Sequence, residues 1–220
     1  MSSGAGMNGR PRLLDLFCCQ GGAGEGYRRA GFDVTGVDIE PQPRNPHRFI
    51  QADAIEYLAE HGQEYDAIHA SPPCQAFSRA QKIQGNSHPD LISPLRPRLA
   101  ELGVPYVIEN VDGAPLNNPR LLCGSMFGLR LYRHRLFETN WPLLPPRHSV
   151  HTVPQVKMGR RPKPGEMLQP VGNFSGVAEA REAMGMPWAS RDGLREAIPP
   201  AYTEFIGQQL LTQLEGRVAA

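Results

Sequence analysis

Two side chains whose types suit covalent chemistry lie at the ends of two apolar segments. Cys74 follows Pro72-Pro73 and the apolar run 65–69, and Glu109 lies in a second apolar run, 106–111. Each run is typical of a short buried strand, and the prolines end the first because they cannot donate to a β-ladder. Open α/β sheets bind their ligands at the carboxyl ends of such strands. A thiol and a carboxyl at two strand ends are the groups needed for covalent attack beside a proton donor.

The N-terminal part of the chain has the pattern of a cofactor-binding unit. An apolar strand over 12–17 runs into the glycine-rich stretch 20–26, a helix follows to Ala30, and a second strand over 32–38 ends in Asp38. A loop of this kind brings backbone N–H groups close to a cofactor, and an acid at the second strand's end accepts hydrogen bonds from ribose hydroxyls. No Lys-Ser/Thr pair follows the glycines, which excludes a nucleoside triphosphate loop; NAD remains compatible with the spacing alone.

Taken together, these motifs resemble those of the DNA cytosine-5 methyltransferases. Pro73-Cys74-Gln75 followed by Glu109-Asn110-Val111 resembles that family's catalytic pair. The stretch 15–22 resembles its cofactor loop, with Cys19 where the family has glycine. The stretch 131–137 resembles its Gln-x-Arg-x-Arg motif, with Leu131 in place of glutamine, and 195–200 resembles its last motif, with Arg195-Glu196 in place of Gly-Asn. The resemblance extends over residues 12–214.

This resemblance implies a fold and a reaction. The fold is α/β, a Rossmann-like class I S-adenosylmethionine-dependent methyltransferase with a mostly parallel, doubly wound sheet. The reaction is transfer of a methyl group to C5 of cytosine in DNA through a covalent adduct between Cys74 and C6. Protonated Glu109 would hold the N3 edge, Arg135 the O2 side, and Arg133, expected on the same strand face, would support Arg135 or bind phosphate. Asn110 would orient its loop. A helix expected to begin near Phe77 would lower the pKa of Cys74.

The same resemblance implies the residues that bind S-adenosylmethionine. Phe17 would pack on one face of the adenine and Ile39 on the other, while Asp38 takes the ribose hydroxyls. Asp53 would accept from the adenine amino group, although it is also a good N-cap for a helix over 54–61. The complete predicted set is Asp15, Phe17, Gly21, Gly22, Asp38, Ile39, Asp53, Ala54, Pro73, Ala197 and Ile198.

A segment rich in proline and basic residues, at about 140–172, occupies the place of the family's target-recognition domain. It is too short for a separate folded domain, so we expect a small excursion that contacts phosphates and gives a short or relaxed sequence preference. A linker with no role in DNA binding is the alternative. The residues predicted to contact DNA are Gln75, Ser78, Arg79, Lys82, Arg160 and Arg161.

Composition sets the remaining expectations. The 220 residues predict one domain over 10–220 behind a disordered leader over 1–9, and a net charge of +1 gives no overall signal for nucleic acid. No apolar run suits a membrane span or signal peptide, and the four cysteines (Cys18, Cys19, Cys74 and Cys123) lack metal-ligand spacing. We therefore expect reduced thiols, no metal, and a location in the cytoplasm of a bacterium or of a phage-infected host.

Several alternatives stay open at this point. An RNA (tRNA-type) cytosine-5 methyltransferase would keep the same site, and a non-catalytic DNA-binding module would keep only the fold. An NAD-dependent oxidoreductase would explain the glycine loop and Asp38 but leaves Cys74 and Glu109 without a role. Compact methylases of phages, mobile elements or restriction–modification systems match the chain's size, and a partner protein that supplies sequence specificity is compatible with it.

Overall fold

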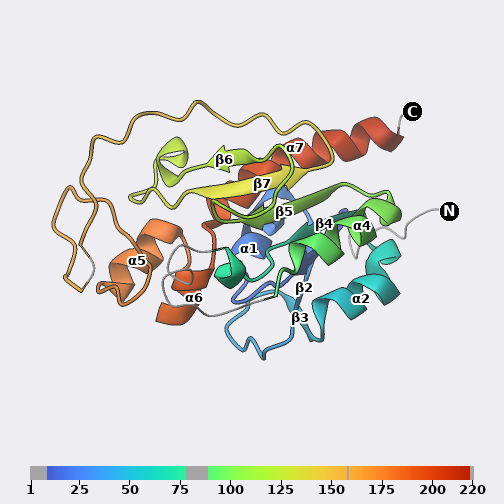
Figure 1. Ribbon diagram of the computed structural model, residues 1–220, viewed down its shortest axis with the longest axis horizontal. Coiled ribbons are helices and arrows are strands. Elements are labelled where there is room, and N and C mark those ends of the chain that lie inside the picture. Colours follow the sequence, from blue (N-terminus) through green and yellow to red (C-terminus); the bar gives the residue numbers. More distant parts are fainter. Residues whose placement is uncertain (1–8, 78–88, 158, 219–220) are drawn as a thin grey trace.

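The computed structural model describes residues 9–77, 89–157 and 159–218. Within these ranges, seven strands form one sheet in the order β3-β2-β1-β4-β5-β7-β6 (Figure 1). The first five strands along the chain are parallel, and β7 runs antiparallel to both of its neighbours. The mostly parallel sheet expected from the sequence is therefore confirmed. The strands are β1 (Arg12–Leu16), β2 (Asp33–Asp38), β3 (Arg48–Gln51), β4 (Ala67–Ala70), β5 (Tyr106–Asn110), β6 (Arg120–Leu122) and β7 (Arg135–Thr139).

Helices cover both faces of this sheet because successive strand residues point to opposite sides. Leu13 of β1 packs in a cluster with Tyr27 and Tyr202, whereas its neighbour Leu14 packs with Leu58 and Leu95 on the other face. The first face carries α1 and α7, and the second carries α2 and α4. The helices are α1 (Gly22–Ala30), α2 (Ala54–His61), α4 (Ile92–Leu102), α5 (Val177–Met184), α6 (Arg191–Glu196) and α7 (Pro200–Val218), with 3₁₀ turns η1 (Gly62–Glu64), η2 (Cys74–Ala76) and η3 (Gly124–Phe127).

The contact between α1 and α7 depends on a glycine. A Cβ atom at Gly26 would lie 2.1 Å from the carbonyl oxygen of Pro200 and 2.1 Å from Oγ1 of Thr203. Thr203 in turn donates a hydrogen bond to the carbonyl of Ala23. The two helices therefore approach backbone to backbone, which fixes the glycine loop against the start of α7.

The segment that follows β7 contains no helix or strand over its described residues until α5 begins at Val177. In Figure 1 it is the long yellow-to-orange stretch that passes outside β6, the edge strand of the sheet. Two isolated bridges, between Leu131 and Leu168 and between Gln155 and Met167, give it some order. No helix among the described residues is long and apolar enough to cross a membrane.

The expected strand through Arg133 is wrong. β7 begins at Arg135, where its pairing with Leu122 of β6 ends, and Arg133 adopts a left-handed backbone conformation with φ 38°. Arg133 and Arg135 therefore do not alternate along one strand face. The expected leader over 1–9 falls almost wholly outside the described residues, as do Ser78, Arg79 and Lys82.

Candidate active site

A cavity of about 320 Å³ lies at the carboxyl ends of the parallel strands. It gathers residues from β1, β2 and β5, from the loops after β1 and β4, and from the segment just before α7. Both residue sets singled out in the sequence meet here. From the predicted sites, the lining includes Asp15, Phe17, Gly22, Asp38, Ile39, Pro73, Cys74, Gln75, Glu109, Arg135, Ala197 and Ile198.

The loop that carries Cys74 is held from behind by Asn110. The side-chain amide of Asn110 donates to the carbonyl of Pro72 at 2.9 Å, and its oxygen accepts from the N–H of Val111 at 2.9 Å. Asn110 is almost fully buried and does not line the cavity. This side chain therefore couples the end of β5 to the loop after β4, and the position of the Cys74 thiol depends on it.

Glu109 and Arg135 form the polar wall opposite the thiol. Nε of Arg135 lies 3.0 Å from Oε1 of Glu109, and both side chains are largely buried. Burial raises the pKa of Glu109, while the charges of Arg135 and Arg133 and the hydroxyl of Ser71 oppose that shift. The net increase favours the protonated carboxyl, which is the form that can donate a proton.

The pKa of Cys74 differs from the sequence-based expectation. Burial raises the pKa of this thiol, and it outweighs the opposing charges of Arg135 and Arg133. Among the described residues only the single 3₁₀ turn η2 follows the cysteine, so no long helix supplies the positive end that was expected to lower the pKa. The expected depression of this pKa is therefore wrong for the protein without its substrates.

A buried hydrogen-bonded chain behind Glu109 was not anticipated from the sequence. Tyr27 Oη lies 3.0 Å from Nδ1 of His69, and Nε2 of His69 lies 2.8 Å from Oγ of Ser71, the neighbour of Glu109. Burial lowers the pKa of His69 to about 3, so its imidazole is neutral and has one N–H. The consistent assignment has Tyr27 donating to Nδ1, His69 donating to Ser71, and Ser71 donating to Glu109. A histidine inside an otherwise apolar strand was the available signal.

The opposite end of the cavity contains two acids. Burial, with a smaller contribution from the charge of Asp38, raises the pKa of Asp15 to about 8. The Gly24 backbone N–H offsets part of this shift, and none of the other described residues donates a well-aligned hydrogen bond to the Asp15 carboxyl. Asp38 accepts from the N–H groups of Cys19, at 2.9 Å, and Glu40, at 3.0 Å. Each oxygen of Asp38 keeps a second lone pair for a ligand hydroxyl.

The loop between the two acids keeps a glycine-like backbone without the glycine. Cys19 has φ 44°, in the left-handed region that glycine adopts most readily. At Gly22 a Cβ would lie 2.6 Å from the carbonyl oxygen of Ile198. The start of α1 therefore lies directly against the segment that precedes α7, and the replacement at position 19 has not changed the local backbone path.

Comparison with known proteins places this architecture. No protein-family model matches the sequence. The chain is 33% identical over 118 residues to the type II methyltransferase M.FnuDI of Fusobacterium nucleatum, covering 46% of this chain and 33% of that protein. It is 30% identical over 129 residues to the type II methyltransferase M.XorII of Xanthomonas oryzae, covering 50% of this chain and 30% of that protein. The chain thus spans about a third of the length of these curated relatives.

Two solved structures match nearly the whole chain. One is a prophage-encoded protein from E. coli described as a DNA modification methyltransferase, with a TM-score of 0.63, 16% identity, and coverage of 94% of this chain and 99% of that one. The other is the Dnmt2 methyltransferase of S. pombe, with a TM-score of 0.64, 16% identity, and coverage of 93% and 99%. The chain has a methyltransferase fold. The resemblance to methyltransferases drawn from the motifs is confirmed.

Not every residue predicted for function lines the cavity of this methyltransferase fold. Gly21 forms the turn before α1, and Asp53 caps α2 by accepting from the N–H groups of Ile55, at 2.8 Å, and Glu56, at 3.0 Å. The helix-capping alternative for Asp53 is therefore the observed contact, and Ala54, the first residue of α2, is buried beside it without reaching the cavity.

Two predicted arginines are engaged elsewhere. Arg133 is buried, and its guanidinium donates to the carbonyls of Pro170, at 3.2 Å, and Arg195, at 2.7 Å. It therefore braces the cavity wall from behind and does not face a phosphate. Arg160 forms an ion pair with Glu166, so its charge is already matched, whereas Arg161 is exposed in the same segment.

Proposed function

We propose that this protein transfers a methyl group from S-adenosylmethionine to C5 of cytosine in DNA, through a covalent bond between Cys74 and C6 of the base. One observation carries the proposal: a single cavity contains Cys74, Glu109 and Arg135 at one end and Asp15 and Asp38 at the other. A nucleophile, a proton donor and a cofactor-binding wall therefore face the same space. The similarity to type II methyltransferases supports the same reaction class.

The residues present suit S-adenosylmethionine on two observations. The buried carboxyl of Asp15 lacks a full set of partners among the described residues, which suits a ligand that brings its own donors. Ile39 is 64% exposed on the cavity wall although it is a large apolar side chain, which suits a flat adenine that would cover it. When bound, the cofactor supplies an electrophilic methyl group on a sulfonium.

The protein side chains would act in sequence on a cytosine moved out of its stack, since C6 is otherwise inaccessible. The Cys74 thiol loses its proton and its sulfur bonds to C6, while Glu109 donates a proton to N3. The electron pair released onto C5 forms the bond to the methyl group. Loss of the C5 proton then expels Cys74 as thiolate, restores the aromatic ring and returns the N3 proton to Glu109. Arg135, 3.0 Å from Glu109, is placed to donate to O2.

The experiment is covalent trapping with a duplex that carries 5-fluorocytosine. Fluorine at C5 prevents the final elimination, so an active enzyme stays bonded to its DNA. The protein is incubated with S-adenosylmethionine labelled in the methyl group, and the products are separated under denaturing conditions. We expect a labelled protein–DNA species for the wild type and none for Cys74→Ser or Cys74→Ala.

Cofactor affinity, measured by calorimetry on the same samples, is the control for folding and should be unchanged in Cys74→Ser. A parallel arm uses folded tRNA that contains 5-fluorocytosine. An adduct on RNA alone would replace DNA by RNA as the substrate. Absence of any adduct on diverse duplexes and RNAs, with cofactor binding intact, would refute the proposed reaction, and an adduct that survives Cys74→Ala would refute the role of the cysteine.

A further inference from the structure

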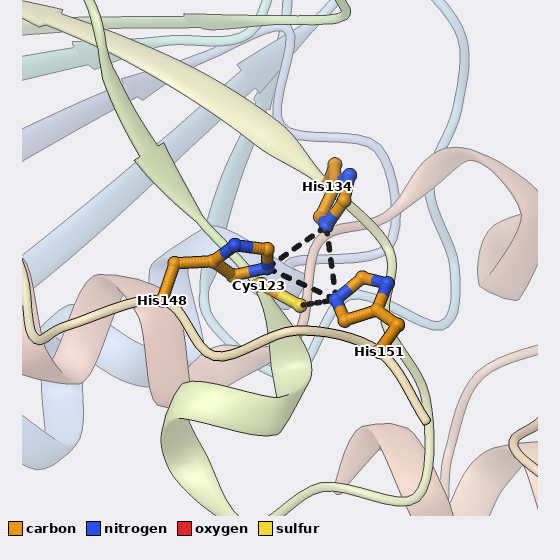
Figure 2. Close-up of side chains that lie close together, drawn as sticks. All are labelled: Cys123, His134, His148 and His151. Carbon is orange, nitrogen blue, oxygen red and sulfur yellow. Dashed lines mark hydrogen bonds between the residues drawn. The ribbon is translucent and has the colours of Figure 1, made fainter. Parts of the chain in front are cut away.

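Four side chains with metal-ligating atoms converge at the outer end of β6 and β7. Cys123 directly follows β6, His134 directly precedes β7, and His148 and His151 belong to the irregular segment after β7. Figure 2 shows the cysteine sulfur and the three imidazole rings pointing toward one another. The ligand atoms all lie within 4.8 Å of one another. This group is separate from the cavity that contains Cys74.

The spacing of these atoms is that of a tetrahedral site. The three histidines all present Nε2, with separations of 3.3 Å between His134 and His148, 3.4 Å between His134 and His151, and 3.0 Å between His148 and His151. Sγ of Cys123 lies 3.3 Å from Nε2 of His151. Zinc–nitrogen bonds of about 2.0–2.1 Å and a zinc–sulfur bond of about 2.3 Å at tetrahedral angles require about 3.4 Å between nitrogens and about 3.6 Å between sulfur and nitrogen. The observed distances differ from these values by only a few tenths of an ångström.

Hydrogen bonding alone does not account for three Nε2 atoms meeting at one point. A neutral imidazole has one N–H, which lies in the ring plane and points at one acceptor. Three mutually close Nε2 atoms therefore cannot each satisfy both neighbours, and protonating more of them would place like charges about 3 Å apart. One cation at the centre would accept a lone pair from every nitrogen and from the sulfur at once.

The surroundings hold the ligands in this arrangement. The ring of Tyr132 stacks on His151 with centroids 3.5 Å apart and an 8° interplanar angle. The hydroxyl of Tyr132 donates to the carbonyl of Val153 and accepts from its N–H, which fixes the chain just beyond His151. Cys123 is fully buried, and its sulfur lies 3.1 Å from Oγ of Ser125. Supporting contacts of this kind orient the ligands of metal sites.

We propose that Cys123, His134, His148 and His151 bind one Zn²⁺ in a closed, structural site. A thiolate with three imidazoles is a ligand set that zinc favours, and four protein ligands leave no open position for catalysis. The metal would tie the segment around His148 and His151 to the strands that flank it, one residue away from Arg135. The proposal replaces the sequence-based expectation of no metal, and it does not depend on the reaction proposed above.

The test measures metal content directly, on full-length protein whose affinity tag has been removed. Inductively coupled plasma mass spectrometry should find about one zinc per chain. Replacement by Co²⁺ should give the visible bands of a tetrahedral complex and a sulfur-to-cobalt charge-transfer band. Cys123→Ser should abolish the charge-transfer band, and His148→Ala should weaken zinc binding at least tenfold.

Matched variants separate loss of a ligand from loss of fold. His61→Ala removes an exposed histidine on α2, and Cys74→Ser removes a cysteine outside the cluster; both should retain zinc. His148 is exposed in an irregular segment, so His148→Ala should fold normally by circular dichroism. Folded protein that neither contains nor takes up zinc at micromolar concentration, or that keeps full zinc binding in the double variant Cys123→Ser/His148→Ala, would overturn the proposal. A different metal at the same stoichiometry would overturn the assignment to zinc.

Discussion

Replacing Asp15 by asparagine should remove a large part of the pH dependence of stability. The pKa of Asp15 is raised to about 8 in the folded protein, mainly by burial, from an ordinary value of 3.8. Between these two values the unfolded chain has lost the proton and the folded chain retains it. Unfolding therefore releases a proton in this range, and the free energy of unfolding falls as the pH rises from about 4 to about 8.

The magnitude follows from the size of this interval. Each pH unit inside it costs the folded state at most about 1.4 kcal/mol, so the loss between pH 5 and pH 7 is about 2.7 kcal/mol. For a chain of this size that corresponds to a Tm decrease of about 5–10 °C. An asparagine side chain has no proton equilibrium in this range, so the Asp15→Asn variant should lack this component while keeping every other pH-dependent contribution.

Urea denaturation at several pH values, followed by circular dichroism without cofactor, measures the difference. Only the difference between wild type and variant is used, because Glu109 also has a raised pKa and contributes equally to both curves. We expect the variant to gain stability relative to wild type as the pH rises from 5 to 7, and the gain to level off above about pH 8. Parallel curves across this range would refute a raised pKa for Asp15 and with it the inference that this carboxyl lacks a full set of partners.

Three further perturbations test the packing and the site. Gly26→Ala should destabilise the protein by about 1–3 kcal/mol or more, because its Cβ would collide with α7; Gly216→Ala, where nothing lies within 4 Å, should change stability by less than about 1 kcal/mol in thermal denaturation. Asn110→Ala should slow formation of the 5-fluorocytosine adduct about 100-fold without changing cofactor affinity by calorimetry, since it positions the Cys74 loop; an equal loss of affinity would contradict that role. Ser71→Ala removes a hydrogen bond that lowers the pKa of Glu109, so the alkaline limb of the adduct-formation rate should move to higher pH, and an unmoved limb would exclude the contact.

Elements defined by local pattern were predictable from the sequence. The apolar run at 12–17 became β1, the run at 106–111 became β5, and Asp53 caps a helix that spans the expected residues 54–61. Each of these depends on residues close together in the chain, such as a strand's apolar run or a cap within three residues of the N–H groups it accepts from. The stripe near the C-terminus likewise became α7.

Features that depend on contacts between distant segments were not predictable in the same way. The alternation rule placed Arg133 and Arg135 on one face, but it applies only inside a strand, and pairing with β6 stops at Arg135. The histidine cluster was missed because its members are separated by β7 and by a long irregular segment, so their linear spacing resembles no common zinc motif. The pair His148-x-x-His151 was the one local signal.

The irregular segment after β7 is ordered by the domain beneath it. Its buried residues Leu168 and Phe174 pack with Leu131, and Arg133 donates to the carbonyl of Pro170. The proposed metal would add a third attachment, through His148 and His151. Such a segment needs no core of its own, but it has little surface left to offer a DNA groove. Because each well-formed base contact supplies about 1–3 kcal/mol of discrimination, a few contacts from so small a segment can specify only a few base pairs. We therefore expect methylation at a short sequence, and a footprint that shrinks further when His148 is replaced.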